Sequence, residues 1–303
     1  MRDMKQRNAI ISLALAGAIW GSSVALSKLS LGWLDATWLT ALRFGVAAPV
    51  LALIARRHLR RAFNARVILA GAVGYGVTML LQNAGIEHTS VSHAAIIVGG
   101  VPVMVAVVSA GLGHGRSSGV AWVGYGVALL GIVFVARGGG GGASSDGDLL
   151  VLASVVMSAA MIAVQPRLLV DQDAAAVTAV QFAAASLVAL PVALISGGLP
   201  HAPATAEPVI AFLVLALLGT VVPFWLFAHG QKGTSAQFAG ALVNIEPLVG
   251  AVVGWVAFAD PVGVWQIVGA VAMVVGILLS TVSWDRIICA GLPQRLQARF
   301  ELL

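Results

Sequence analysis

The chain has 303 residues, of which 59% are hydrophobic and only 10% are charged, and its mean hydropathy is +0.98. Because a soluble globular protein carries about 25% charged residues, this chain has too few charges to cover a water-facing surface, which excludes the soluble classes and indicates a membrane protein. The net charge is +5, but the basic residues lie in short clusters between apolar runs, a pattern typical of membrane topology and not of a nucleic-acid-binding face.

The first apolar run follows the basic residues Arg2, Lys5 and Arg7 and extends from Ala9 to Leu26. It is long enough to span a bilayer and longer than the core of a signal peptide, and no small-residue cleavage site follows it. It therefore predicts a retained first span. Nine more apolar segments follow, separated by loops too short to hold a soluble domain. We place the ten spans at residues 9–28, 36–55, 67–86, 93–113, 120–137, 148–168, 176–196, 208–229, 235–258 and 264–283.

Lysine and arginine are distributed unevenly between the loops. If the N-terminus is cytoplasmic, all 17 of these residues except Lys28, Arg43 and Arg137 fall on the cytoplasmic side. The positive-inside rule then places both termini in the cytoplasm, and we expect a multi-pass protein of the bacterial inner membrane. For Lys28 and Arg43, near the outer ends of spans one and two, we favour snorkelling to the lipid headgroups. Pairing with Asp35 or with an anionic substrate is the alternative.

The two halves of the chain resemble each other. When residue 85 is aligned with residue 230, the segments that follow match without a gap as far as residues 131 and 276. The shared features include a Gly-x-x-x-Thr-Ser junction and a proline within a span. The matching residues include Gly85, Thr89, Ser90 and Pro102, aligned with Gly230, Thr234, Ser235 and Pro247.

This internal similarity predicts a first five-helix repeat over residues 1–142, a second over residues 143–283 and a cytoplasmic tail over residues 284–303. The glycine-rich segment 138–148 is the flexible linker between the repeats. Because five is an odd number, the second repeat enters the membrane upside down. The predicted fold is an all-α polytopic membrane protein with ten transmembrane helices arranged as two inverted five-helix repeats.

Two predicted spans carry a face suited to binding a substrate. Tyr75, Met79 and Gln82 share one face of span three because they are spaced by four and three residues. An aromatic ring, a thioether and an amide suit a pocket that stacks a ring and binds a polar head. The alternative is a helix interface in which Gln82 forms hydrogen bonds. Trp20 and Ser23 form a similar pair in span one, where Trp20 lies deeper than interfacial tryptophans do.

Later spans add two candidate titratable groups and a pair of prolines. Glu246 lies near the middle of span nine, where a charge costs about 2.5–3.5 kcal/mol, so it is a candidate for substrate binding or proton coupling; a structural carboxyl is the alternative. Trp225 and His229 in span eight are candidates for substrate binding and proton coupling respectively. The alternative for both is a position at the membrane interface. Pro102 and Pro247 are aligned between the repeats, and we predict that they are gating hinges.

Three short motifs lie in spans one, two and nine. They are Ile19-Trp20-Gly21-Ser22-Ser23, Ala41-Leu42-Arg43-Phe44 and Asn244-Ile245-Glu246-Pro247. Together they resemble the motifs of the EamA-type drug/metabolite transporters, and within that family the chain is similar to bacterial exporters of aromatic amino acids. Two loops depart from the family pattern. His114-Gly115-Arg116 stands where an acidic residue is frequent, and Asp260-Pro261 replaces a Gly-Glu pair.

The resemblance implies a central cavity and export of metabolites, often amino acids. We therefore expect a secondary transporter that exports small metabolites, with aromatic amino acids favoured, by alternating access. A multidrug or lipid-linked-substrate translocator of the same fold, or a channel, is the alternative. An enzyme is not expected, because the chain has neither a Gly-x-Ser-Gly nucleophile motif nor a His-Glu-x-x-His zinc motif.

No cofactor or metal is expected. Cys289 is the single cysteine, which excludes an intrachain disulfide and a cysteine-based metal site. The expected partners are a small-molecule substrate and the lipid bilayer, without nucleic acid. The choice between monomer and homodimer stays open.

Overall fold

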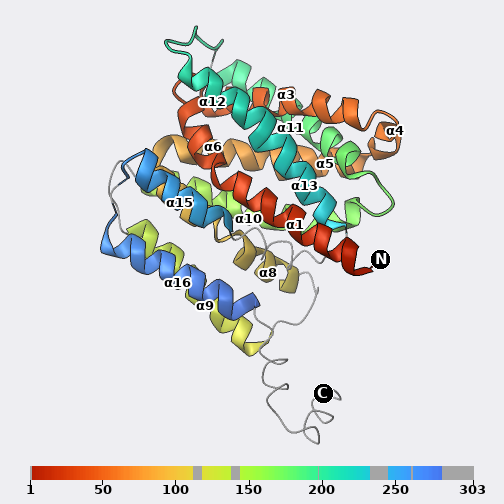
Figure 1. Cartoon of the computed structure of the whole chain (residues 1–303). Helices are drawn as coiled ribbons and strands as arrows, with labels where there is room; N and C mark the ends of the chain where they lie inside the picture. Colours follow the sequence, from red (N-terminus) through yellow and green to blue (C-terminus); the bar gives the residue numbers. More distant parts are fainter. Residues whose placement is uncertain are drawn as a thin grey trace, which may run out of the picture.

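The computed structural model describes residues 2–111, 118–137, 144–196, 198–232, 245–260 and 262–281. Every regular element among these residues is a helix, and the helices lie side by side in one bundle (Figure 1). The predicted linker at 138–148 is described only from residue 144, and the predicted tail at 284–303 lies outside the described residues.

The first half of the chain forms five helical spans, several of which are broken into shorter helices. Their elements are α1 (Arg2–Gly21), α2 (Ser23–Ser30), α3 (Ala36–Ile54), the connecting α4 (Leu59–Ala62), α5 (Ala65–Gly71), the π-helix η1 (Ala72–Val77), α6 (Thr78–His88), α7 (Val91–Val98), α8 (Val101–Gly111) and α9 (Gly119–Arg137).

The second half repeats this plan. Its elements are α10 (Ser145–Leu168), α11 (Ala174–Ser196), α12 (Glu207–Ala216), the π-helix η2 (Leu217–Val221), α13 (Val222–Gln231), α15 (Ile245–Ala257) and α16 (Val264–Thr281). Among the described residues, seven helical runs are long and apolar enough to cross a membrane, and α9 and α16 provide two shorter apolar helices. The span predicted at 235–258 is described from residue 245 onward, as α15.

The second span of each half starts in the same way. Asp35 caps α3 by accepting hydrogen bonds from the backbone of Thr37 and Trp38 at 2.8 and 2.9 Å, and Asp173 caps α11 by accepting one from Ala176 at 2.9 Å. Such caps satisfy backbone N–H groups that have no partner within the helix. These aspartates are 138 positions apart, so the first two spans of the repeat align at a shift of 138, and the later spans at a shift of 145. Further identities at the shift of 138 include Ala36, Thr40, Ala41 and Phe44 with Ala174, Thr178, Ala179 and Phe182.

The π-helices η1 and η2 start at residues 72 and 217, which correspond at the shift of 145. Each brings a glycine against a residue from the first span of the other half. Gly74 lies against Met161 of α10, and Gly219 lies against Ser23 of α2. Because Met161 and Ser23 correspond at the shift of 138, the two contacts are equivalent.

The packing of α9 on α16 is also reciprocal. A Cβ atom added at Gly124 would lie 2.6 Å from the carbonyl oxygen of Gly276, and one added at Gly131 would lie 2.6 Å from that of Gly269. Gly124 corresponds to Gly269 and Gly131 to Gly276, so the same surface of each repeat meets its own counterpart, as across a two-fold axis. The predicted fold, with two inverted repeats, is confirmed.

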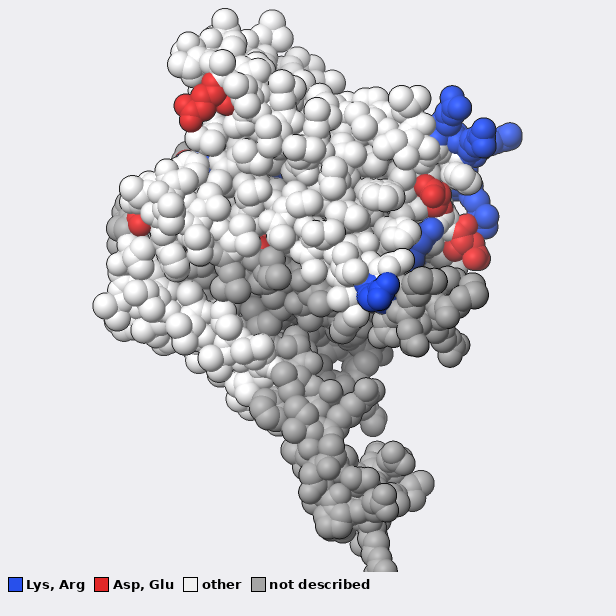
Figure 2. Space-filling view, in the orientation of Figure 1, with Lys and Arg blue, Asp and Glu red and all other residues white. Residues whose placement is uncertain are grey.

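Charge separates the two ends of the bundle. The basic end carries the exposed arginines of the α3–α5 connection, and Figure 2 shows lysine and arginine gathered there. The opposite end is formed by the loops at 31–35, 88–91, 198–206 and 258–263. Hydrogen bonds join these loops, including that from the Trp33 Nε1 to the carbonyl oxygen of His201 at 2.9 Å. The arginines of the basic end are Arg56, Arg57, Arg60, Arg61 and Arg66.

Lys28 does not reach toward lipid headgroups, so the snorkelling prediction was wrong for this residue. Its Nζ donates hydrogen bonds to the carbonyl oxygens of Ile86, Glu87 and Thr89 at 2.7, 3.0 and 2.8 Å. These carbonyls end α6 and have no partner within that helix. A cation at the C-terminal end of a helix also interacts favourably with the helix dipole, so Lys28 fixes the end of α6 to α2.

Candidate functional site

A cavity lies between the two repeats. Its empty volume, counting the space at its mouth, is about 820 Å³. Its walls come from α1, α2, α3, η1, α6, α7 and α8 of the first half and from α10, α13 and α15 of the second.

Most of the predicted substrate-binding residues line this cavity. The stripe predicted on span three faces it, although residues 72–77 are a π-helix and not an α-helix. The residues of that prediction found in its wall are Trp20, Ser23, Tyr75, Met79, Gln82 and Glu246.

The first span of each repeat contributes corresponding residues to the wall. Trp20, Ser23, Val24 and Ser27 come from α1 and α2, and their counterparts at the shift of 138 come from α10. All of them line the cavity, the counterparts being Ser158, Met161, Ile162 and Gln165. The cavity therefore lies on the pseudo-two-fold axis.

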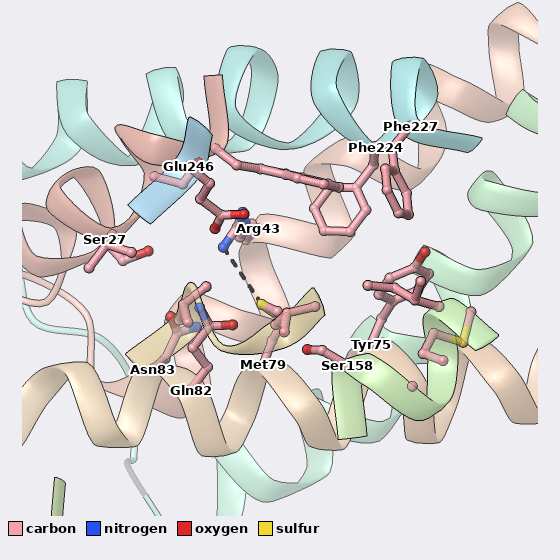
Figure 3. Close-up of a pocket in the computed structure, with 18 of the residues that line it drawn as sticks. Ser27, Arg43, Tyr75, Met79, Gln82, Asn83, Ser158, Phe224, Phe227 and Glu246 are labelled. Carbon is pink, nitrogen blue, oxygen red and sulfur yellow. Dashed lines mark hydrogen bonds between the residues drawn. The ribbon is translucent and has the colours of Figure 1, made fainter. Parts of the chain in front are cut away.

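Arg43 is the feature that sequence reasoning misplaced. Its side chain is only 4% exposed and points into the cavity (Figure 3). The Nε donates to the Thr220 Oγ1 at 2.6 Å, and the guanidinium also contacts the Gly219 carbonyl oxygen at 3.4 Å and the Met79 sulfur at 3.9 Å. The snorkelling prediction was wrong because Arg43 lies seven residues beyond Ala36, about 10 Å below the start of α3.

Glu246 lies beside Arg43 in the cavity wall and interacts with it electrostatically (Figure 3). It is the second residue of α15, in the first turn of that helix. The cavity thus holds one cationic and one anionic side chain, from opposite repeats. Asp35, the alternative partner considered for Arg43, is engaged in capping α3.

Aromatic rings surround the part of the cavity away from this pair of charges. The ring of Phe224 lies 4.7 Å from that of Trp20 and 5.2 Å from that of Tyr75, both in edge-to-face geometry. The ring of Phe227 lies 5.1 Å from that of Trp20. Edge-to-face pairs are favourable arrangements of aromatic rings, so these side chains form a fixed apolar wall.

Phe224 and Phe227 were missed at the level of sequence, although a signal was present. They correspond to Met79 and Gln82 at the shift of 145, and they line the same cavity. Tyr75 corresponds in the same way to Thr220, the partner of Arg43. Extending the repeat alignment into span three would have identified all three.

The remaining predicted residues lie elsewhere. Trp225 is 40% exposed and His229 is exposed, and their rings lie 5.9 Å apart on the face of α13 that points away from the cavity. Pro102 is the second residue of α8, after the break at Gly99-Gly100, and Pro247 is the third residue of α15. The hinge role of the two prolines stays a prediction.

Two buried polar atoms in the cavity wall have no hydrogen-bond partner among the described residues. They are the Trp20 Nε1, a donor, and the Asn83 Oδ1, an acceptor. Buried polar groups are nearly always hydrogen-bonded in folded proteins, so these two atoms are exceptions in the cavity wall.

Comparison with known proteins gives the family. The model of the EamA-like transporter family matches the chain twice, over residues 7–137 and 145–282. An uncharacterized transporter of Archaeoglobus fulgidus is 24% identical over 89% of this chain and 96% of its own length, and the uncharacterized transporter YyaM of Bacillus subtilis is 24% identical over 92% and 95%.

A solved crystal structure with 19% sequence identity superposes with a TM-score of 0.70, covering 92% of this chain and 98% of its own, and so shares the fold. The two family matches fall on the two structural repeats described above. The chain belongs to the EamA-like transporter family and is a multi-pass membrane transporter.

Proposed function

We propose that this transporter exports small zwitterionic metabolites, with aromatic amino acids favoured, across the bacterial inner membrane by alternating access. The observation that carries the proposal is the pair of opposite charges, Arg43 and Glu246, in one aromatic-walled cavity. Charged side chains within a membrane span are costly and mark functional sites.

The Arg43 guanidinium is suited to bind a carboxylate. Arginine has five N–H donors in a planar fork that matches carboxylate geometry. Among the described residues its contacts are one short hydrogen bond to Thr220, a longer one to Gly219 and a weak sulfur contact to Met79. Donors therefore remain for a ligand.

The other parts of an aromatic amino acid have matching groups. The Glu246 carboxylate suits the substrate ammonium group, and the rings of Trp20, Phe224 and Phe227 suit its aromatic ring. These groups come from both repeats, so a movement of one repeat against the other would change access to the substrate while the site stays between them.

The distribution of charge supports an orientation. The five exposed arginines of the α3–α5 connection support a cytoplasmic position for the basic end under the positive-inside rule. The opposite end then faces the periplasm. Export is the direction that the family resemblance implies.

A translocator of lipid-linked or amphipathic substrates is the second candidate, and one observation favours it. A surface groove between α5 and α10 carries Arg66 and Arg167 and shares Gly74 and Met161 with the wall of the cavity. Val73 in this groove is 44% exposed, as expected for a surface that faces lipid. A substrate could enter along this groove from the cytoplasmic leaflet.

Counterflow into proteoliposomes distinguishes the candidates. The competitors are phenylalanine, phenethylamine, phenylpropionate, leucine, a nucleoside and an acidic phospholipid analogue. The proposal expects phenylalanine to compete best and both one-charge analogues to compete at least about tenfold less well, since each loses one charge-assisted interaction. If phenethylamine or phenylpropionate competed as well as phenylalanine, the zwitterion site would be refuted. Competition by the lipid analogue alone would favour the second candidate, and ohmic currents would favour a channel.

A further inference from the structure

A buried polar network lies at the end of the bundle opposite the basic end. His93 of α7 is 1% exposed, Asp148 of α10 is 6% exposed and Gln266 of α16 is 2% exposed. Such side chains are rarely buried unless they are paired. We call these three residues, together with Thr89, Ser92 and Asp260, the end network.

Asp148 is the centre of the network. Its Oδ1 accepts a hydrogen bond from the Thr89 Oγ1 at 2.6 Å, and its Oδ2 lies 3.3 Å from the His93 Nδ1. The other ring nitrogen of His93 lies 3.4 Å from the Gln266 Nε2. These contacts join α7 of the first repeat to α10 and α16 of the second.

Asp260 provides a second connection between the repeats. Its Oδ2 accepts hydrogen bonds from the backbone N–H and the hydroxyl of Ser92 at 2.7 and 2.8 Å. Ser92 lies in the first turn of α7, where a carboxylate is favoured by the helix dipole. The start of α7 is thus held by α10, by α16 and by the loop between α15 and α16.

The network is close to the cavity. Val98, in the helix that carries His93, lines the cavity, and so does Ile86, three residues before Thr89. Movement of the start of α7 away from α10 and α16 would therefore open the cavity toward this end.

In the sequence, the ionisable and amide side chains of the network are not repeated at the corresponding positions of the other repeat. At the shifts that align the repeats, His93 corresponds to Phe238, Gln266 to Ala121 and Asp148 to Ile10. Asp260 corresponds to Gly115. Because α1 and α9 form with the apolar residues Ile10 and Ala121 at two of these positions, the polar side chains are not needed to form the corresponding helices. Their presence at one end calls for a role specific to that end.

We propose that the end network is a latch that keeps the cavity closed toward the end opposite the basic end and that has to break before the cavity opens there. His93 and Asp148 are then positioning residues for transport, because they hold helices and do not contact the substrate. The proposal rests on the alternating access proposed above. In a variant with a weakened latch, a larger fraction of the molecules adopts the form that is open toward this end.

Accessibility of a cysteine in the cavity tests the latch without a substrate. The reporter is Ser27→Cys in a Cys289→Ser background, labelled with a membrane-impermeant thiol reagent in right-side-out and in inside-out membrane vesicles. Asp148→Asn and His93→Phe weaken the latch, the second by introducing the residue found at position 238. We expect each to raise periplasmic labelling about tenfold, the effect of losing one charge-assisted hydrogen bond, and to lower cytoplasmic labelling.

The matched control is Asp146→Asn, because Asp146 is exposed in the first turn of the same helix; it should leave both labelling rates unchanged. Asp260→Asn breaks the second connection and should act like Asp148→Asn. The latch can therefore still be tested if one of these two variants does not fold. Equal labelling from the periplasmic side in the parent and in variants that elute as folded protein would overturn the latch. So would an equal rise on both sides, which indicates loosened packing. Absence of counterflow for every competitor, with the labelling shift intact, would refute the proposed substrate and leave the latch standing.

Discussion

Arg43 and Gln181 occupy corresponding positions in the two repeats, and the difference between them gives the cavity its positive charge. Gln181 is fully buried and exchanges two hydrogen bonds with Gln165, at 2.9 and 3.2 Å, so its amide is satisfied within the protein. Ser27, the counterpart of Gln165, is not among the hydrogen-bond partners of Arg43 in the described part of the chain. The guanidinium is instead held by Thr220 and faces the cavity.

Replacing Arg43 tests whether this charge binds the substrate. Arg43→Gln introduces the residue of the other repeat and should weaken phenylalanine binding about 10- to 100-fold, because a hydrogen bond to a charged group contributes about 1.5–3 kcal/mol. Arg43→Lys keeps the charge but lacks the planar fork of N–H donors, so its affinity for phenylalanine should lie between those of the parent and of Arg43→Gln. Binding is measured as the half-saturating concentration in counterflow. Unchanged binding in Arg43→Gln would show that the guanidinium has a structural role only.

Among the described residues that line the cavity, Glu246 is the one with a carboxyl group. A carboxyl group can take up and release a proton, so Glu246 is the candidate to carry a coupling proton. If it carries the coupling proton, Glu246→Gln should abolish accumulation driven by a pH gradient. Counterflow, which needs no gradient, should continue, with the half-saturating concentration raised about tenfold by loss of the contact to the substrate ammonium group. His229→Gln serves as the comparison, because His229 is exposed and lies outside the cavity. Gradient-driven accumulation that survives in Glu246→Gln would remove the coupling role.

At the scale of the helical elements, glycines set how closely the repeats approach. α9 contains a matched pair of glycines for a test. A Cβ atom added at Gly131 would lie 2.6 Å from the carbonyl oxygen of Gly269, whereas one added at Gly126 would meet no atom within 4 Å. Gly126→Ala should leave the melting temperature unchanged or raise it slightly, since alanine favours a helix by about 1 kcal/mol over glycine. Gly131→Ala should lower it by several degrees, because the added methyl group forces α9 away from α16. Thermal unfolding in detergent, followed by the loss of helical circular dichroism, measures both; equal shifts would show that this approach is not tight.

At the scale of the whole molecule, apolar runs, loop charges and the internal sequence similarity were enough to predict the described helices, their order and the repeat. The face of each helix that turns toward the cavity was harder to predict. Spacing shows that Tyr75, Met79 and Gln82 share a face, but the direction of that face depends on the neighbouring helices. For Trp225 and Phe224, adjacent in α13, only the packing of α1 on α13 shows which of them turns to the cavity. The π-helices η1 and η2 were not predicted, because a single π-helical turn leaves no distinct pattern of apolar residues in the sequence.

The inverted arrangement makes a prediction about sidedness that does not depend on any substrate. His88 ends α6 and Lys232 follows α13, and these two exposed positions are near counterparts in the repeats. Inversion places them on opposite sides of the membrane, with Lys232 at the basic end. In a Cys289→Ser background, His88→Cys should react with an impermeant thiol reagent in right-side-out vesicles, whereas Lys232→Cys and Arg57→Cys should react only after the membrane is permeabilised. Labelling of His88→Cys and Lys232→Cys from the same side would contradict the inversion. The cavity would then no longer lie between two antiparallel repeats, and alternating access would lose its structural basis.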